Sequence, residues 1–321
     1  MNIIFAKKSF FFELSKPIKS SIKEIKFKKG WIIKLKNEFE SEGFGEISPI
    51  QFKDFEICQK EISQIPEIIN EKKLSLIIKY FHPCVQSGIN SALAEINEKI
   101  IFKDQYPFQE IYQTAILLDS KSVIKQLKIF KDNYDLKEKK ITFKWKVAIK
   151  DNQIEEKVLE QILSELTPNI KIRIDANGSW DRDTANKWAD ILKNNKNLDW
   201  LEQPLSKDDI KGMEEINKKI PVALDESLMK YPKLIDSWRG WQIRRPSQES
   251  NPMKLYEELK NKKGFISISS SFETGIGRRM LYHLSDLQLM GPTPKVPGLA
   301  LMQMPKSNLF LNKGKLIWER L

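Results

Sequence analysis

The chain has 321 residues, of which 40% are hydrophobic and 30% charged, as is usual for a soluble globular protein with a large core. Its formal net charge is +11, but lysines and glutamates are interspersed without a dense basic block, which argues against a nucleic-acid partner. No apolar run reaches the roughly 18 residues of a membrane span, and Lys7 and Lys8 interrupt any signal peptide, so we expect a cytoplasmic protein without a membrane partner.

Residues 1–88 have the texture of a small α+β unit. Strand-like runs occur at 2–6 and 31–35, and a Gly-rich turn, GFGEISP, is predicted at 43–49. A helical stretch begins at about Asp54. We expect residues 300–321 to complete this unit with a strand pair, 309–310 and 315–318.

Residues 89–299 alternate between short strands and helical patterns. The clearest helix is 154–166, where apolar residues recur at 3.6-residue spacing. Seven or eight such units in about 210 residues favour a closed α/β barrel over an open sheet, and no Gly-rich dinucleotide fingerprint follows the first strand. The predicted strands are 115–119, 141–149, 170–175, 198–202, 220–225, 241–245 and 265–270.

Charged residues end five consecutive predicted strands. They are Lys146, Asp175, Glu202, Asp225 and Arg245, separated by 29, 27, 23 and 20 residues, about one strand–helix unit each. A barrel brings the carboxyl ends of its strands to one mouth, so these side chains should surround one site.

The three carboxylates in this set predict a metal site. Asp175 alone would more often be a helix cap or a loop acceptor. Asp175, Glu202 and Asp225 together would repel one another in a partly dry mouth unless a cation were present. A hard oxygen site without His or Cys suits Mg²⁺, with Mn²⁺ as a possible substitute. Asn177 and Glu226 are candidates to orient the ligands.

Lys144 and Lys146 flank Trp145, so they point to the same face of a strand. A solvated strand edge is the alternative explanation in a lysine-rich chain. Beside a divalent cation, each lysine would lower the pKa of the other, so that a neutral amine can remove a proton α to a carboxylate. The cation would stabilise the enediolate that results.

Four segments, KWK, RIDANGSWD, WLEQPL and VALDESL, resemble in order and spacing the muconate-lactonizing-like branch of the enolase superfamily. That superfamily is known for pairing a Lys base with Mg²⁺. The resemblance implies a modified TIM barrel, (β/α)7β, over residues 89–299, with an N-terminal α+β capping domain at 1–88. It also implies that Asp175, Glu202 and Asp225 bind the metal, that Lys146 is the base and later the acid, and that Lys144 is its electrostatic partner.

The sixth strand departs from the family pattern, which usually has Lys before Pro. Here the segment is IRRP, with Arg245 in that position. An arginine stays protonated and cannot act as a base. Racemases and epimerases of this branch need a base on each face of the substrate, whereas a syn dehydration needs one. Arg245 therefore favours a dehydratase in which the guanidinium faces the enediolate; a nearby salt bridge is the competing explanation.

The segment SSSFETGIG, 269–277, resembles the seventh-strand loop of the o-succinylbenzoate synthases. Because a helix N-terminus attracts anions, we predict that Ser269, Ser270, Ser271 and Gly275 bind the side-chain carboxylate of the substrate; an ordinary turn is the alternative. GFGEISP resembles the capping-domain loop of the family, which implies that Gly45 approaches the substrate and that residues 10–17 act with it as a lid.

The resemblance implies a lyase that dehydrates 2-succinyl-6-hydroxy-2,4-cyclohexadiene-1-carboxylate to o-succinylbenzoate in menaquinone or phylloquinone synthesis. The expected partner is this small carboxylate, and the protein is a monomer or a homo-oligomer. Two alternatives stay open. One is another enzyme of the branch, a dipeptide epimerase or a cycloisomerase, and the other is a catalytically silent metal-binding homologue.

Overall fold

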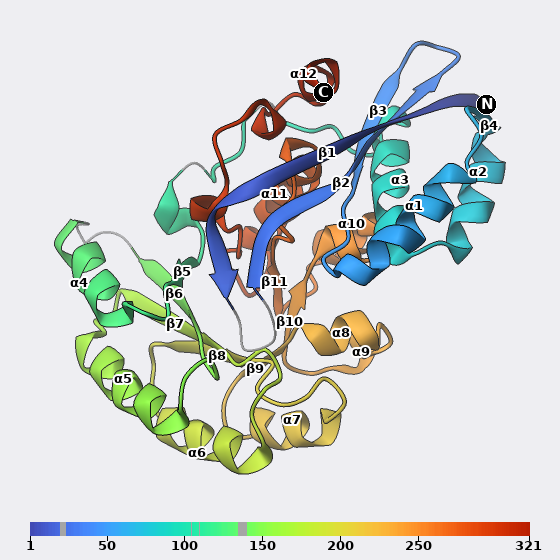
Figure 1. Ribbon diagram of the computed structural model, residues 1–321. Helices are drawn as coiled ribbons and strands as arrows, with labels where there is room; N and C mark the ends of the chain where they lie inside the picture. Colours follow the sequence, from blue (N-terminus) through green and yellow to red (C-terminus); the bar gives the residue numbers. More distant parts are fainter. Residues whose placement is uncertain (20–23, 104, 109, 134–139) are drawn as a thin grey trace.

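The computed structural model describes residues 1–19, 24–103, 105–108, 110–133 and 140–321. An antiparallel sheet with its own helices lies above a curled parallel sheet that is covered by helices on its outer side (Figure 1). The predicted fold, an α/β barrel with an N-terminal cap, is confirmed. Among the helices of the described ranges, none combines the length and the apolar character needed to cross a membrane.

The cap is built on a four-stranded antiparallel sheet with the order β3-β2-β1-β4. One face of this sheet packs on three helices through a cluster of buried side chains that includes Trp31, Ile33 and Ile89. The other face points toward the barrel, and Phe12 and Ile32 are buried there. The elements are β1 (Asn2–Lys19), β2 (Glu24–Asn37), β3 (Glu42–Ile47), β4 (Ile68–Asn70), α1 (Phe55–Ser63), α2 (Glu71–Ile77) and α3 (Pro83–Ile96).

The predicted Gly-rich turn is wrong, because residues 42–47 form strand β3, which pairs with β2 from Trp31↔Ile47 to Lys36↔Glu42. The glycines of β3 allow the backbone of helix α3 to pack directly against the strand. A Cβ on Gly45 would stand 1.9 Å from the carbonyl oxygen of Gly88. Residues 10–17, expected to act as a lid, lie within β1.

Two boundaries differ from the sequence-based ones. The expected division at residue 88 falls inside α3, a continuous helix that packs against β2 and β3. The predicted C-terminal strand pair is wrong, because residues 308–310 form a 3₁₀ turn and α12 (Gly314–Arg320) is a helix. Short apolar runs fit either structure, and here Ile317 is buried one helical turn after Gly314, in a cluster with Phe44.

Seven parallel strands form the barrel sheet, hydrogen-bonded in chain order from β5 to β11. Each of the seven predicted runs contains one of them, and the predicted helix 154–166 corresponds to α5. The strands are β5 (Ile116–Leu118), β6 (Ile141–Lys146), β7 (Ile170–Asp175), β8 (Leu198–Glu202), β9 (Val222–Leu224), β10 (Trp241–Arg244) and β11 (Ile266–Ile268).

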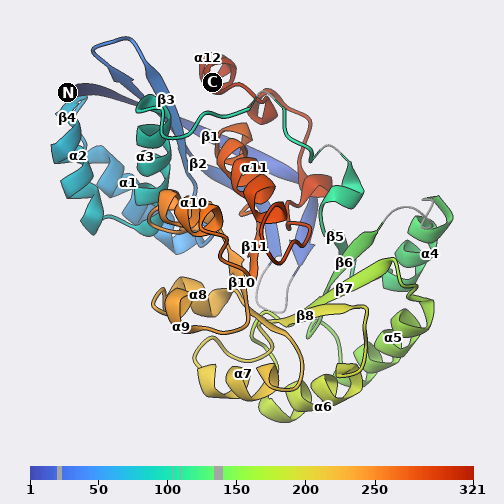
Figure 2. The ribbon, with the colours of Figure 1, turned by 180° about the vertical axis from the view of Figure 1, so that it is seen from behind.

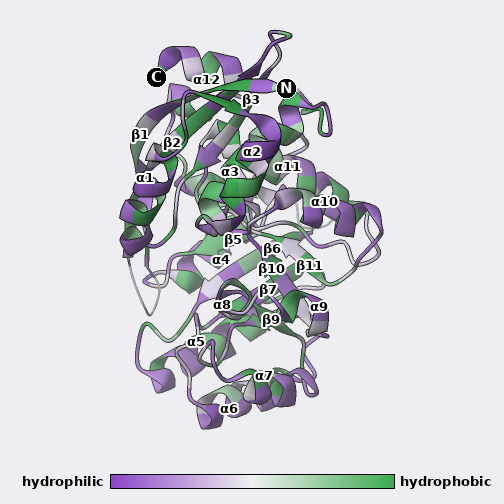
Figure 3. Cartoon of the chain, turned by 90° about the vertical axis from the view of Figure 1, so that its right-hand side faces the viewer, coloured by the Kyte–Doolittle hydropathy of each residue, from purple (hydrophilic) through white to green (hydrophobic). Residues whose placement is uncertain are grey.

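Helices cover the outer side of this sheet, and Figure 2 shows α4 to α7 following one another around it. Figure 3 shows that α5, α6 and α7 turn hydrophilic residues outward, while hydrophobic residues gather along the strands. The helices are α4 (Val123–Asn133), α5 (Asn152–Glu165), α6 (Arg182–Leu192), α7 (Ile210–Asn217), α8 (Glu226–Lys230), α9 (Leu234–Ser237), α10 (Pro252–Lys260) and α11 (Gly275–Leu289).

An extended segment, 297–299, closes the ring between β11 and β5. On one side the amide of Gly298 donates to the Ile268 carbonyl oxygen, and the amide of Ser270 donates to that of Gly298. On the other side the amide of Ala115, just before β5, donates to the Pro297 carbonyl oxygen. This segment takes the eighth position, as the predicted (β/α)7β architecture requires.

Large side chains fill the barrel interior below its mouth. The rings of Trp200 and Trp241 stack with centroids 4.8 Å apart. The guanidinium of Arg173 lies 4.0 Å from the Trp200 ring centroid and pairs with Asp199. This packed floor leaves the charged residues at the strand ends to face the cap.

Candidate active site

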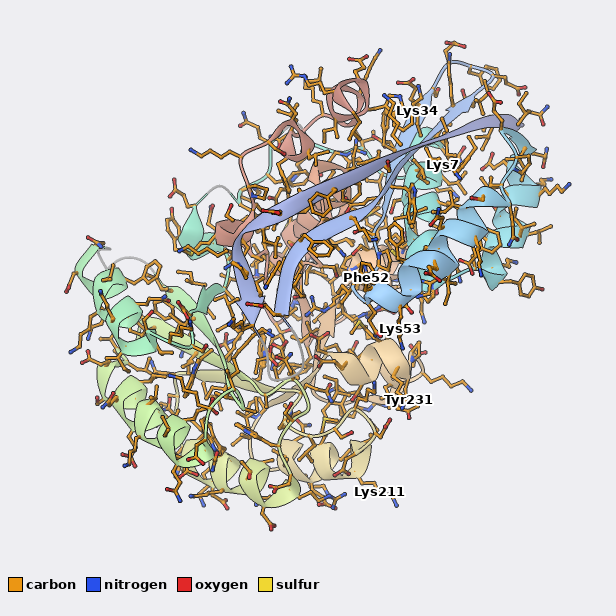
Figure 4. The ribbon with its side chains drawn as sticks, viewed as in Figure 1. Lys7, Lys34, Phe52, Lys53, Lys211 and Tyr231 are labelled. Carbon is orange, nitrogen blue, oxygen red and sulfur yellow. The ribbon has the colours of Figure 1, made fainter. Side chains whose placement is uncertain are left out.

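A cavity of about 640 Å³ separates the barrel mouth from the cap. The barrel contributes charged residues to its wall, among them Lys144, Lys146, Glu202, Asp225 and Arg245. The cap contributes residues of β1, β2 and the segment after β3, such as Ile18, Lys28 and Phe52; Figure 4 shows Phe52 between the helices of the cap and those of the barrel.

Lys144 and Lys146 enter this cavity from strand β6, side by side. The Nζ of Lys144 lies 2.9 Å from Asp175 Oδ2 and 2.5 Å from Glu202 Oε1. The Nζ of Lys146 lies 3.1 Å from Asp175 Oδ2 and donates to Asn177 Oδ1 at 2.8 Å. Their side chains are only 15% and 16% exposed, so neither stands on a solvated strand edge.

The carboxylates around Lys144 decide its protonation. Burial alone would lower the pKa of Lys144, but Asp175, Glu202 and Asp225 outweigh burial and raise it. The lowered pKa expected for one lysine of the pair is therefore not found at Lys144. In turn, burial would raise the pKa of Asp175, but Lys144 and Lys146 lower it. Lys144 is thus the fixed cation of the pair.

Arg245 lies on the opposite side of the cavity, because β10 is four places from β6 in the eight-membered ring. Its Nε and Nη2 donate to the two oxygens of Asp225 at 2.8 and 2.5 Å, and its Nη1 donates to the Ser270 carbonyl oxygen. The salt bridge weighed as a competing explanation therefore exists, yet the same side chain lines the cavity. Burial would lower the pKa of Arg245, but Asp225 raises it, so this side of the cavity offers a permanent cation.

The predicted metal ligands, Asp175, Glu202 and Asp225, are all buried at this mouth, and a fourth carboxylate, that of Glu226, lies beside them. Burial and the charges of Asp225 and Asp175 raise the pKa of Glu226 to about 7. One carboxylate oxygen of Glu226, Oε2, is buried without a hydrogen-bond partner among the described residues, and Asn177 Nδ2 donates to the other at 3.0 Å. Burial also raises the pKa of Glu202. The charges of Asp175 and Asp225 raise it further, whereas Lys144 lowers it.

The chemistry of this donor set fits a hard divalent cation such as Mg²⁺, since the buried carboxylates of Asp175, Glu202 and Asp225 and the half-buried carboxylate of Glu226 supply oxygen donors at one mouth. As the side chains stand, the carboxylates of Asp175, Glu202 and Asp225 turn to Lys144, Lys146 and Arg245. No group of three or more His, Cys, Asp or Glu residues in the described part of the chain is arranged to hold a metal ion. Asp175 Oδ1 also accepts a hydrogen bond from the backbone amide of Asn177 at 3.0 Å. Asp175 is therefore also a loop acceptor, the role that a lone aspartate at a strand end would most often have.

The predicted carboxylate-binding loop is only partly at the cavity. Ser269 and Ser270 line it. The amide of Ser271 instead donates to both oxygens of Glu273, at 2.8 and 2.9 Å. Gly275 packs under the C-terminal segment, where a Cβ would meet the Leu311 carbonyl oxygen.

The N-terminus of helix α11, expected to attract the substrate, holds a carboxylate of the cap. Glu46 Oε2 accepts from Thr274 N at 2.9 Å, Thr274 Oγ1 at 2.6 Å and Gly277 N at 3.1 Å. Gly45 and Glu46 line a second, small cavity of about 20 Å³ with Glu273. The amides of Thr274 and Gly277 therefore join the barrel to the cap through Glu46.

The buried charged residues that sequence reasoning missed include Lys28, Glu46 and Glu273, each 5% exposed or less. Lys28 stands among lysines in the sequence, and Glu46 was read as part of a loop. A signal existed for Glu46, because its neighbours on both sides are small or apolar. A charged residue in such a run is buried with partners or marks a site.

Residues 136–236, which carry strands β6 to β9 and both lysines, match the family model described as enolase C-terminal domain-like. The matched residues include the strand-end residues Lys146, Asp175, Glu202 and Asp225. By this segment the chain resembles the enolase superfamily. Sequence patterns alone had suggested the same family.

The chain is 26% identical over 286 residues to the o-succinylbenzoate synthase of Thermosynechococcus vestitus, covering 84% of this chain and 85% of that protein. The crystal structure of o-succinylbenzoate synthase from Thermosynechococcus elongatus BP-1, complexed with Mg in the active site, is similar in fold. It has a TM-score of 0.79 at 23% identity, over 99% of this chain and 100% of that one. The L-Ala-D/L-Glu epimerase of Bacillus subtilis has a TM-score of 0.72 at 15% identity, over 95% and 92% of the two chains.

Proposed function

We propose that this protein is an o-succinylbenzoate synthase, which dehydrates 2-succinyl-6-hydroxy-2,4-cyclohexadiene-1-carboxylate to o-succinylbenzoate. The observation that carries the proposal is the asymmetry of the cavity. A pair of amines enters from β6, and a guanidinium held by both oxygens of Asp225 stands on the opposite side. Only one side can supply a neutral base, which suits a one-base dehydration and opposes a two-base epimerisation.

Lys146 carries out both proton transfers. Its amine takes the proton from C1 of the ring, and its ammonium then returns a proton to the hydroxyl on C6. The C6–O bond breaks, water leaves, and a C1–C6 double bond completes an aromatic ring. Both transfers occur on the same face, so a single amine suffices.

The remaining residues stabilise the negative charge that forms on the ring carboxylate. Lys144, whose pKa the carboxylates raise, stays cationic beside Lys146. Arg245 presents its charge from the other side of the cavity. Mg²⁺, held by Asp175, Glu202 and Asp225, would supply further stabilisation of the enediolate. The cap strands exclude water from this mixed-charge site.

The proposal is supported by the 26% identity to a curated o-succinylbenzoate synthase over most of both chains. By likeness to such relatives, we propose that the reaction belongs to menaquinone or phylloquinone synthesis in the cytoplasm. Aromatisation of the ring supplies much of the driving force, so a site with Arg245 in place of a lysine can suffice.

A turnover assay with the cyclohexadiene substrate and Mg²⁺ tests the proposal. The wild type should form o-succinylbenzoate, and Lys146→Ala should lose a factor of roughly 10² to 10⁴ in kcat. Undiminished product formation by Lys146→Ala would remove the proposed base. Exchange of the α-proton with solvent deuterium, without dehydration, would instead support another reaction of the superfamily.

A further inference from the structure

The cap contributes one deeply buried cation to the cavity. Lys28 lies on β2, opposite Phe12 of β1, and is 5% exposed. It lines the same cavity as Lys146 and Arg245, although it comes from the other domain. Its strand lies over the barrel mouth (Figure 1).

The ammonium of Lys28 has partners, but none of them is an acid. Its Nζ donates to the carbonyl oxygens of Ser48 at 2.9 Å and Pro49 at 3.1 Å. An ammonium has three N–H donors, so two neutral acceptors anchor it and one donor remains. Among the ion pairs formed within the described residues, none includes Lys28, whereas Lys144, Lys146 and Arg245 are all paired with carboxylates.

The charged groups nearest to Lys28 only partly balance it. Burial lowers the pKa of Lys28, and Arg245 acts in the same direction. Cys84, Glu273 and Glu46 raise its pKa, but both acids already accept hydrogen bonds from Ser and Thr side chains. A buried cation held by neutral carbonyls gains from an anion that enters the cavity.

The wall of the cavity that Lys28 lines suits a carbon chain that ends in a carboxylate. Apolar side chains of both domains line it, namely Ile18, Ile25, Leu117 and Phe272. The amides at the start of α11, which were expected to bind this carboxylate, are occupied by Glu46. We propose that Lys28 binds the second carboxylate of the substrate, at the end of its succinyl side chain.

The inference rests on the proposed function, since that function names a substrate with two carboxylates. It gives the cap a part in specificity: the barrel binds the ring carboxylate, where the bonds change, and the cap binds the distant one. A pair of ligands that do not react tests the role of Lys28 separately from the proposed dehydration. o-Succinylbenzoate carries the second carboxylate, and 2-butyrylbenzoate has a methyl group in its place.

Binding of both ligands to the Mg²⁺-loaded protein is measured by calorimetry for the wild type, Lys28→Gln and Lys28→Met. Gln removes the charge but keeps two N–H donors on a side chain one atom shorter, whereas Met removes both the charge and the donors. We expect Lys28→Gln to weaken o-succinylbenzoate about tenfold to a hundredfold and 2-butyrylbenzoate by less than about threefold. The control is Lys34→Gln on the same strand, which pairs with Glu42 and lies away from the cavity (Figure 4); it should change neither affinity.

Equal weakening of both ligands by Lys28→Gln and Lys28→Met would overturn the inference, because it would show a structural role only. An unchanged affinity for o-succinylbenzoate would overturn it as well. The turnover assay of the wild type is separate. Failure to dehydrate the cyclohexadiene, with the ligand selectivity intact, would remove the proposed reaction but keep Lys28 as a carboxylate-binding residue.

Discussion

Glu46 illustrates how a single buried side chain can set the pH response of the protein. Glu46 is 4% exposed, and its Oε1 atom is buried with no hydrogen-bond partner in the part of the chain that the structure describes. Burial and the nearby charge of Glu273 raise the pKa of Glu46 to about 7 against the three hydrogen bonds at its other oxygen. The carboxyl group of Glu46 therefore stays protonated in the folded protein over a pH range in which it is ionised in the unfolded chain.

The sign of the resulting effect on stability follows from that difference. Between the ordinary pKa of 4.5 and about 7 the folded state binds more protons, so the contribution of Glu46 to stability falls as pH rises. We expect Glu46→Gln to be more stable than the wild type by about 2 kcal/mol at pH 8, and by little near pH 5. Urea denaturation at several pH values measures this. A variant less stable than the wild type at every pH would contradict the prediction.

Arg245 allows a prediction about the charge that faces the proposed base. Arg245→Lys keeps one positive charge but replaces the two-pronged contact to Asp225 with a single donor. We expect kcat/KM for dehydration to fall about tenfold, with Lys146 still required. Steady-state kinetics of Arg245→Lys and of the double variant with Lys146→Ala measures both effects. Activity in the double variant would mean that a lysine at position 245 can act as the base.

The predicted site residues that line the cavity share one property: each lies at or near the carboxyl end of a barrel strand. Lys144, Lys146, Glu202, Asp225 and Arg245 line one cavity for that reason. Lys28 and Glu46 do not follow that rule, because their burial depends on how the cap packs on the barrel. No local pattern encodes a contact between Glu46 and Thr274, which are 228 residues apart.

At the scale of elements, strand β3 and helix α3 form the tightest contact of the cap. A Cβ on Gly45 would lie 1.9 Å from the Gly88 carbonyl oxygen, and one on Gly43 would lie 2.1 Å from that of Ala92. Both are backbone atoms and cannot move aside without shifting the helix. The glycines that suggested a turn are therefore needed for packing inside a strand.

Gly45→Ala should separate β3 from α3 and destabilise the protein by about 2 kcal/mol or more, since overpacked contacts with backbone relax poorly. Gly264→Ala is the matched control, because the atoms nearest to a Cβ there are side-chain atoms of Pro292 and Thr293 at 3.3 Å. We expect the control to change the free energy of unfolding by less than about 1 kcal/mol. Equal effects of the two substitutions in urea denaturation would refute the packing argument.

Elements with a strong period were predicted well, and short ones were not. The seven barrel strands and helix α5 combine apolar periodicity with the length that each structure needs. Helix α12 has only seven residues, and its run Leu316-Ile317-Trp318 fits a strand equally well. The contact of Ile317 with the cap decides its conformation, and sequence periodicity does not contain that contact.

For the whole molecule, the cap and the barrel are joined by charged contacts from distant parts of the chain. Arg279 of α11 donates hydrogen bonds from both terminal nitrogens to the carboxylate of Glu95 of α3, at 2.6 and 3.0 Å. Glu46 of β3 holds the N-terminus of α11, and Ser87 Oγ donates to the Pro246 carbonyl oxygen just after β10. The cavity thus has one wall from each domain, and its shape depends on both staying together.

This dependence leads to a prediction for metal binding and removal. Asp175, Glu202 and Asp225 come from three strands and meet only in the folded barrel, so Mg²⁺ should bind the folded state and stabilise it. At a hundredfold excess over its dissociation constant, the ion should raise Tm by about 5 °C or more. Differential scanning calorimetry with added Mg²⁺, and again after EDTA, measures the increment. Asp225→Asn should remove most of it whatever its own Tm, because the variant lacks one charged ligand. An equal increment in Asp225→Asn would mean that the ion binds elsewhere, and the lysines and Arg245 would then be the cations that balance the three strand-end carboxylates.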